Sequence, residues 1–333
     1  MDKYISLDYG SGGKKTSELI EKMIVPAFAN EALEQLGDGA VLDGAGKIVF
    51  STDSFVINPY FFPGGDIGKL SVCGTVNDVS MSGGEPKYIS LSAIIEEGFP
   101  TSDLEKIIAS IKKTADAAGV MVVTGDTKVV EKGKGDGIYL NTAGVGFLRH
   151  PGLSPKRIRK GDKVIVSGNV GDHGTAVMLA RNPNLVSAPI KSDCAPLNEL
   201  AASLKGLGDD IRVLRDPTRG GLATTLCEFV EGSCLTIELD EEAIPVSKAT
   251  ASACDILGLD PLYAANEGKM IVVAAPEKAD EALQILRKQP LGADAAIIGE
   301  VTDSHPGRVL IRTSFGGTRI ATKLAGAQLP RIC

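Results

Sequence analysis

The sequence predicts a two-domain protein of the α/β or α+β class. Short apolar runs typical of strands alternate with stretches of helical periodicity through both halves of the chain. At 333 residues, the chain has room for two domains of ordinary size. A loop rich in proline and basic residues, 150–161, lies between the halves and indicates the domain boundary.

In the first half, apolar periodicity and turn residues predict the elements in order. Ser102 and Glu105 have the spacing of a capping box, which predicts a helix that runs to about Ala118. The other predicted elements are helices at 16–28 and 66–82, and strands at 47–51, 87–95, 120–124 and 137–147.

The second half repeats this alternation. A glycine-rich turn at 168–174 leads into one helix, and the segment 216–221 leads into another at 222–230. The remaining predictions are strands at 163–167, 270–274, 296–301 and 308–312, and a helix at 277–288.

Composition and charge exclude several classes of function. The chain is 43% apolar and 23% charged, and its formal net charge of −7 comes without a long basic run. Nucleic acid is therefore not an expected partner, because backbone binding needs clustered Lys and Arg. No apolar run approaches the length that crosses a bilayer, and the first residues lack the apolar core of a signal peptide. We expect a cytoplasmic protein with no membrane partner.

Six cysteines stand at 73, 194, 227, 234, 254 and 333, with no C-x-x-C pair and only three histidines, so a structural zinc site is not predicted. Cys333 is the last residue. No later segment can fold back over it, so we expect it outside the core, on a mobile arm. Arg331 nearby favours the reactive thiolate form. The alternative is a frayed tail with an incidental thiol.

Four aspartates in the first half lie in or beside segments of small residues: Asp38, Asp53, Asp78 and Asp126. Asp53 and Asp126 directly follow apolar strands. Carboxylates in such places can hold Mg²⁺ against the phosphates of a nucleotide, although aspartate is also common in turns and as a helix cap. The chain has neither the P-loop sequence nor the glycine fingerprint of dinucleotide-binding folds.

A glycine-rich segment, Gly10-Ser11-Gly12-Gly13, precedes the first predicted helix. Backbone N–H groups of such loops can wrap phosphates. A plain flexible loop is the alternative.

Other polar residues are candidates for chemistry. Lys128 is positioned to neutralise a phosphoryl group, and Glu267 to serve as a general base. His173 and Arg219 stand at the starts of predicted helices, where anions bind well. Surface solvation, capping and structural ion pairs are the alternatives for these residues.

Seven segments of the chain are distinctive when taken together. They are GSGG at 10–13, TVNDVSM at 75–81, GDTKVV at 125–130, GDHG at 171–174, RDPTRGGLA at 215–223, NEGK at 266–269 and PRIC at 330–333. Together they resemble the HypE family of hydrogenase maturation proteins, also called carbamoyl dehydratases, over nearly the whole chain. The terminal Pro-Arg-Ile-Cys is the most specific element of the resemblance, because the other segments are partly shared across the aminoimidazole ribonucleotide synthetase superfamily.

The resemblance implies the superfamily's two-domain α/β fold. The N-terminal domains of a homodimer would pair into a barrel-like sheet. Residues 1–152 would form the domain for ATP binding and dimerisation, residues 153–322 the C-terminal α/β domain, and residues 323–333 a mobile tail that ends in the reactive cysteine.

The resemblance also implies a reaction, the ATP-dependent dehydration of a carbamoylated C-terminal cysteine to a thiocyanate. The cyanide would serve the iron of [NiFe]-hydrogenase. HypF would load the carbamoyl group, and the HypC–HypD complex would accept the cyanide. Cys333 would carry the substrate, with Glu267 as the base and Lys128 beside it. The loop 10–13 and Asp38, Asp53, Asp78 and Asp126 would hold ATP and Mg²⁺.

Other readings have distinct signatures. Selenophosphate synthetases carry a reactive residue near the N-terminal glycine loop, whereas the first cysteine here is Cys73. The chemistry of aminoimidazole ribonucleotide synthetase or of thiamine monophosphate kinase leaves the terminal cysteine unexplained. A non-catalytic assembly scaffold whose tail only docks on partners would consume no ATP.

Overall fold

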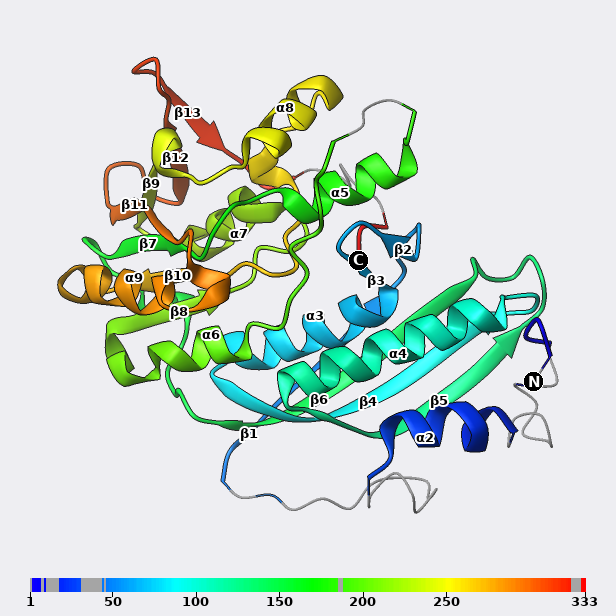
Figure 1. The fold of residues 1–333 in the computed structure, drawn as a ribbon. Helices are drawn as coiled ribbons and strands as arrows, with labels where there is room; N and C mark the ends of the chain where they lie inside the picture. The colour runs from blue at the N-terminus through cyan, green and yellow to red at the C-terminus, as the bar shows by residue number, and fades with distance from the viewer. Residues whose placement is uncertain are drawn as a thin grey trace.

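Two separate β-sheets, one in each half of the chain, form the framework of the protein (Figure 1). The computed structural model describes residues 2–6, 9, 18–30, 44, 46–184, 188–324 and 331–333. Within these residues, the first sheet has four strands in the order β1-β6-β4-β5, and the second has seven in the order β13-β12-β9-β11-β7-β10-β8. A small third sheet pairs β2 (Phe61–Phe62) with β3 (Gly65–Asp66). The predicted two-part α/β architecture is confirmed.

The four-stranded sheet is covered by helices on one face. β1 and β4 both run antiparallel to β6, whereas β4 and β5 pair in parallel and are joined by the crossover helix α4 (Thr101–Ala118). Figure 1 shows α3 (Ile67–Met81) and α4 lying side by side over the sheet. The strands are β1 (Ile48–Phe55), β4 (Gly84–Glu96), β5 (Met121–Val130) and β6 (Ile138–Leu148).

α3 is the central helix of the molecule. All of its residues except Lys69 and Asp78 are buried, because the sheet, α4 and the second domain surround it. A helix covered on every side has to satisfy its polar side chains internally. Thr75 Oγ1 accordingly lies 2.5 Å from Thr142 Oγ1 of β6, and the Ser71 hydroxyl donates to the carbonyl of Gly68 at 2.9 Å.

The two long helices begin differently. Asp66 caps α3, since its Oδ1 accepts hydrogen bonds from the backbone N–H groups of Gly68 and Lys69 at 2.8 and 3.1 Å. α4 begins after Pro100 without a side-chain cap. The predicted capping box of Ser102 and Glu105 is therefore wrong, because the helix starts at Thr101 and Ser102 already lies within its first turn.

The seven-stranded sheet fills the second half. β9 and β12 pair in parallel, and the other neighbours are antiparallel. The predicted strands correspond to β7 (Lys163–Val166), β10 (Ile271–Ala274), β11 (Ala296–Thr302) and β12 (Arg308–Arg312). The sequence reading missed β8 (Ile211–Arg215), β9 (Thr236–Asp240) and β13 (Thr318–Ala321), which are short and interrupted by charged side chains.

Helices flank this second sheet. Three of them match predicted helices: α5 (Asp172–Arg181), α7 (Gly221–Val230) and α9 (Ala279–Arg287). Two were not predicted: α6 (Asn198–Ser203) and α8 (Lys248–Leu257). Near the start of the chain, the helix predicted at 16–28 contains a π-helical turn, Ile20–Ile24, followed by α2 (Val25–Phe28). Short 3-10 turns lie at Pro155–Arg157, Leu204–Asp210, Glu241–Ala243, Pro261–Tyr263, Pro276–Lys278 and Pro290–Gly292.

One buried asparagine of α3 joins the two domains. The Asn77 side-chain amide donates to the carbonyls of Ala195 and Glu267 at 3.2 and 3.3 Å, and its Oδ1 accepts from the N–H of Leu197 at 2.7 Å. Because a buried amide left without partners costs about 1–3 kcal/mol, this set of bonds favours one relative placement of the domains.

Across the described part of the chain, no helix combines the length and the apolar character needed to cross a lipid bilayer.

The cap of α3 provides a test of the fold. Asp66 also accepts a hydrogen bond from the Ser110 hydroxyl of α4 at 2.6 Å, so it ties the two long helices together. We expect Asp66→Ala to lower the free energy of unfolding by about 1–2 kcal/mol, because a helix cap and a cross-helix bond are both lost. Urea denaturation measures this change. Asp294→Ala, an exposed loop aspartate, is the matched control and should leave stability unchanged. Equal stability of the two variants would contradict the capping role.

Candidate active site

The last three residues of the chain lie between the two domains, beside β2 (Phe61–Phe62) and β3 (Gly65–Asp66) (Figure 1). The Val56 N–H donates to the carbonyl of Cys333 at 3.2 Å, and the Asn58 N–H donates to that of Arg331 at 3.4 Å. Cys333 is only 7% exposed. The expectation that the terminal cysteine lies outside the core is wrong, because residues of both domains, rather than a later segment, cover it.

The sulfur of Cys333 accepts a hydrogen bond from a cationic side chain. Arg219 Nε, in the segment just before α7, donates to Cys333 Sγ at 3.2 Å. Burial raises the pKa of the Cys333 thiol to about 11, and the negative charge of Glu267 adds to this shift, whereas Arg219 partly opposes it. At neutral pH the docked thiol is therefore protonated and a poor nucleophile.

Glu267 is held in place through its backbone. Its N–H donates to Asp193 Oδ1 at 3.1 Å, and the N–H of Gly268 donates to Asp193 Oδ2 at 3.3 Å. The two segments approach so closely that a Cβ on Gly268 would lie 1.8 Å from the carbonyl oxygen of Asp193. Glycine is therefore required at 268 to position the glutamate.

The carboxyl of Glu267 is buried and incompletely bonded. The residue is 2% exposed, and its Oε1 has no hydrogen-bond partner among the described residues. Burial raises the pKa of Glu267 well above its usual value, and nearby acidic groups, among them Asp216 and Asp53, raise it further. A buried acceptor left unpaired beside the thiol is suited to receive an N–H group of a substrate attached to that sulfur.

Three carboxyl groups interact electrostatically with one another, and one of them, Asp53, also acts on the Cys333 thiol. Asp53 of β1 faces Asp78 of α3, whose Oδ2 accepts from the Ser51 hydroxyl at 2.8 Å. Burial raises the pKa of Asp53 and of Asp78. Asp216, in the loop after β8, is 4% exposed, and its pKa is raised to about 7 by burial and by the charges of Asp78 and Asp53. Mutually repelling carboxyls of this kind favour a bound cation.

The donor set suits Mg²⁺ bound together with phosphate. Among the described residues, no cluster of three or more His, Cys, Asp or Glu side chains has the geometry to hold a metal ion by itself. Asp53 and Asp78 offer two hard oxygen ligands, and Mg²⁺ commonly takes one or two carboxylates while substrate phosphates and water complete its shell.

Asp126 and Lys128 lie on the other face of the four-stranded sheet. Residues paired across neighbouring strands point to the same face of a sheet, and successive residues point to opposite faces. Asp126 pairs with Ser92, and Ser92 pairs with Asn141. Asp53 instead pairs with the next residue, the buried Thr142, on the helix-covered face. Lys128 Nζ lies 2.8 Å from Asp126 Oδ1, and this pairing lowers the pKa of Asp126. Both side chains are more than half exposed. Within one subunit, the sheet separates this pair from Cys333.

Five of the predicted site residues lie outside the described residues. These are Gly10, Ser11, Gly12, Gly13 and Asp38.

Two residues that were predicted only as groups at the starts of helices contact the chain end in the structure. Arg219 reaches the sulfur, and His173 Nε2 lies 2.8 Å from the carbonyl oxygen of Ile332. Both belong to glycine-containing turns that precede helices, so a local signal was present. Their convergence on Cys333 depends on long-range packing, which the local pattern does not contain.

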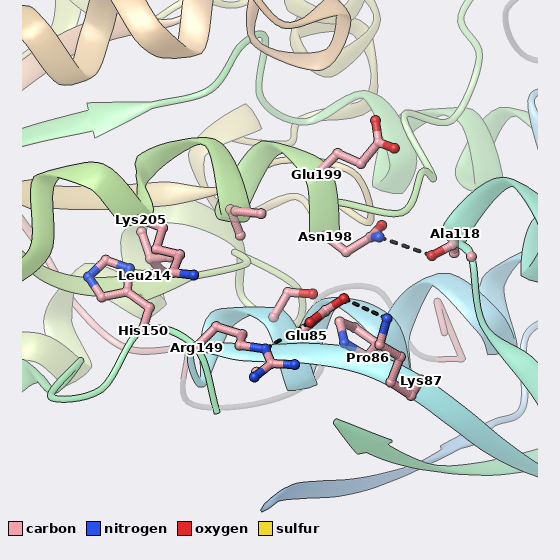
Figure 2. Close-up of a pocket in the computed structure, with 16 residues that line it drawn as sticks. Glu85, Pro86, Lys87, Ala118, Arg149, His150, Asn198, Glu199, Lys205 and Leu214 are labelled. Carbon is pink, nitrogen blue, oxygen red and sulfur yellow. Dashed lines mark hydrogen bonds and ion pairs between the residues drawn. The ribbon is translucent and has the colours of Figure 1, made fainter. Parts of the chain in front are cut away.

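A separate cavity of about 390 Å³ lies at the junction of the two domains (Figure 2). Figure 2 shows Glu85 paired with both Lys87 and Arg149, at 2.5 and 2.8 Å. Asn198 of α6 donates to the carbonyl of Ala118 at the end of α4, at 3.0 Å. The lining contains none of the predicted catalytic or metal-binding residues, so this cavity is a seam between domains and not part of the site at Cys333.

The chain matches a known family over most of its length. Residues 36–148 match the N-terminal domain, and residues 159–312 the C-terminal domain, of the AIR synthase related protein family. A protein of Bradyrhizobium diazoefficiens named carbamoyl dehydratase HypE is 50% identical, with 99% of this chain and 96% of that protein covered. A protein of the same name from Cupriavidus necator is 47% identical, with coverage of 99% and 95%.

Solved structures agree. A hydrogenase maturation protein HypE in complex with ATP superposes with a TM-score of 0.94 at 46% identity, covering 98% of this chain and 99% of that one. HypE in a HypE–HypF complex superposes with a TM-score of 0.80 at 49% identity, covering 92% and 99%.

The raised pKa of Cys333 makes alkylation at this thiol depend on pH. With a pKa of about 11, only about one thiol in a thousand is ionised at pH 8. We expect iodoacetamide to modify Cys333 at pH 8 at least roughly 100-fold more slowly than the exposed Cys234, with the rate rising up to about pH 11. Peptide mass spectrometry measures both rates in one sample. Equal rates at pH 8 would show that the chain end does not stay docked.

Proposed function

The chain belongs to the HypE family of carbamoyl dehydratases, and we propose that it carries out the family's reaction at Cys333 in the docked arrangement described above. The enzyme dehydrates the carbamoyl group on Cys333 to a thiocyanate at the expense of ATP, which supplies cyanide for the iron of [NiFe]-hydrogenase. The observation that carries this assignment to named residues is the hydrogen bond from Arg219 Nε to the sulfur of Cys333, on which the charges of Glu267 and Asp53 also act.

The reaction needs activation of a poor leaving group. The thiocarbamate S–C(=O)–NH₂ loses its oxygen and both nitrogen protons to become S–C≡N. Transfer of the γ-phosphoryl group of ATP to the amide oxygen turns that oxygen into part of a phosphate, and the C–O bond then breaks as the second N–H bond does. The products are the thiocyanate, ADP and inorganic phosphate. The protein has to orient the amide, stabilise negative charge and accept protons from nitrogen.

Glu267 is suited to accept the nitrogen protons. Burial keeps the pKa of Glu267 raised well above its usual value while the site holds only the free thiol. An amide N–H aimed at the unpaired Oε1 favours the ionised form and lowers that pKa, so the substrate itself prepares the base. Arg219, 3.2 Å from the sulfur, is placed to stabilise negative charge on the oxygen of the attached group.

ATP and Mg²⁺ are the expected co-substrate and cofactor. Asp53 and Asp78 would hold the metal, which would neutralise phosphate charge, and Asp216 adds to the negative field. The loop Gly10-Ser11-Gly12-Gly13 and Asp38 remain proposed phosphate and metal residues. Asp126 and Lys128 also remain proposals, and on their face of the sheet they would serve a site only at an interface with a second subunit.

The face of the four-stranded sheet that no described helix covers supports a homodimer. This face carries apolar side chains that are more than two-fifths exposed, namely Ile48, Phe50, Ile94 and Met121. Exposed apolar patches of this kind mark interaction sites. A second copy packed face to face would cover them, form the predicted barrel-like sheet, and bring the Asp126–Lys128 pair into the interface.

The docked position of the Cys333 thiol does not suit the loading of the carbamoyl group. Loading requires a nucleophilic sulfur, and the docked thiol is protonated, so residues 323–333 are proposed to swing outward to HypF for loading and to the HypC–HypD complex for cyanide release. Residues 1–152 would form the ATP-binding and dimerisation domain, and residues 153–322 the C-terminal domain. All six cysteines are free, which suits the reducing cytoplasm.

Glu267 and the reaction are tested together. We expect protein carbamoylated at Cys333 to lose one water from its C-terminal peptide on addition of Mg-ATP, as followed by mass spectrometry. Glu267→Gln should slow this loss about 100-fold or more, because the proton acceptor is removed. Glu199→Gln, at an exposed carboxylate of α6, is the control.

Two outcomes would count against this proposal in different ways. A normal rate in Glu267→Gln would remove the assigned base. An unchanged carbamoyl adduct in the unsubstituted protein would favour a carrier or scaffold role.

The dimer has its own test. We expect Phe50→Glu to shift the protein from dimer to monomer in sedimentation velocity, because a charge would be buried in an apolar interface. Phe315→Glu, at a residue that is 98% exposed in the turn between β12 and β13, is the matched control. A Phe50→Glu protein that still sediments as the unsubstituted one does would rule out this face.

A further inference from the structure

A buried histidine contacts the main chain of the last peptide unit. His173, in the first turn of α5, is fully buried. Its Nε2 lies 2.8 Å from the carbonyl oxygen of Ile332, and its Nδ1 lies 2.8 Å from the Ser192 hydroxyl. The Phe62 ring meets the imidazole edge to face at a centroid distance of 5.5 Å, which further limits its rotation.

The chemistry of the partners fixes the tautomer of this ring. The Ile332 carbonyl can only accept, so Nε2 carries the proton. Ser192 Oγ already accepts from the Cys194 N–H at 3.0 Å, which leaves its own hydrogen to be donated to Nδ1. Burial lowers the pKa of His173, and the ring stays neutral. The chain of bonds therefore runs from Cys194 through Ser192 and His173 to the chain end.

These hydrogen bonds influence the position of Cys333 through the planar peptide unit between Ile332 and Cys333. The carbonyl of Ile332 and the N–H of Cys333 belong to the same peptide unit, whose atoms are coplanar. A hydrogen bond to that carbonyl sets the orientation of the plane and so the position of the Cys333 Cα. Rotations about the N–Cα and Cα–Cβ bonds of Cys333 then place the sulfur, and the bond from the Val56 N–H to the Cys333 carbonyl restrains the first of them.

We propose that His173, held in its Nε2–H tautomer by Ser192, is the positioning residue that keeps Cys333 against Arg219 and Glu267. The proposal rests on the proposed function, because the group being positioned is the substrate carried on Cys333. A displacement of about 1 Å at a reacting group can cost on the order of 100-fold in rate, so a contact that touches no reacting atom still governs the reaction.

The opposite end of α5 supports the same contact. Arg181, in the last turn of the helix, donates to the carbonyls of Asn58 and Arg331. Arg331 in turn forms an ion pair with Asp136. These contacts are largely exposed and act two residues before the thiol, whereas the His173 contact is buried and one residue away. We therefore assign the precise placement to His173 and the capture of the tail to the arginines.

Variants of the full-length chain separate positioning from folding. His173→Phe removes both bonds, Ser192→Ala removes the group that fixes the tautomer, and His173→Gln restores an N–H donor near the Nε2 position. His305→Phe, at an exposed histidine of the second domain, is the matched control. Thermal unfolding verifies that each variant is folded.

Two measurements test the proposal. We expect His173→Phe to raise the alkylation rate of Cys333 in the unloaded protein about tenfold, the effect of losing about 1.4 kcal/mol of docking free energy. We also expect the single-turnover rate of water loss at saturating Mg-ATP to fall about tenfold or more, with the half-saturating ATP concentration unchanged. His173→Gln should recover most of both changes, and Ser192→Ala should move both in the direction of His173→Phe.

The outcomes are distinguishable. Folded His173→Phe and Ser192→Ala proteins with normal alkylation and normal turnover would overturn the proposal. If His173→Phe does not fold, Ser192→Ala and His173→Gln decide the question by the same readouts. If the unsubstituted protein shows no ATP-dependent water loss, the proposed function fails, while the alkylation contrast still decides whether His173 holds the chain end.

Discussion

Main-chain pairing of the chain end with the segment after β1 is the interaction on which the site depends. The bonds from Val56 and Asn58 bring residue 333 back across nearly the whole sequence. Without these bonds, the cysteine proposed to carry the substrate would not lie between the two domains. Its proposed partners are Arg219 and Glu267 in the second domain and Asp53 in the first. The proposed catalytic centre thus draws on both domains and on the chain end, and the hydrogen bonds of Asn77 favour one relative position of the two domains.

The acidic groups around Cys333 would be stabilised by a bound cation and by a hydrogen-bond donor on the substrate. Burial raises the pKa values of Asp216 and Glu267, and of the thiol of Cys333, so the negatively charged form of each group is disfavoured in the free enzyme. A divalent ion with a nucleotide, or an amide on the sulfur, would reverse that balance. In the proposed reaction, substrate binding therefore favours the ionised carboxylates.

The sequence predicted the long elements well and the grouping of the acidic residues poorly. The extent of α3 was predictable because the turn Gly83-Gly84-Glu85-Pro86 marks its end. Asp53 and Asp126 both followed apolar runs and were interpreted as strand ends. In the structure both strands continue through these residues, so register decides which face each occupies. Register depends on pairing partners distant in sequence, and for this reason the separation of Asp126 from Asp53 could not be predicted, nor could the meeting of His173 with Ile332.

The burial and high pKa of the docked thiol have a consequence for the lifetime of the enzyme. Peroxides oxidise the thiolate, first to a sulfenic acid and then irreversibly. A Cys333 that is protonated and covered by both domains is protected from this damage while the enzyme waits. In the proposed cycle, the thiol is exposed to oxidation only while the tail is undocked, so the contacts that place the sulfur for dehydration would also protect it between turnovers.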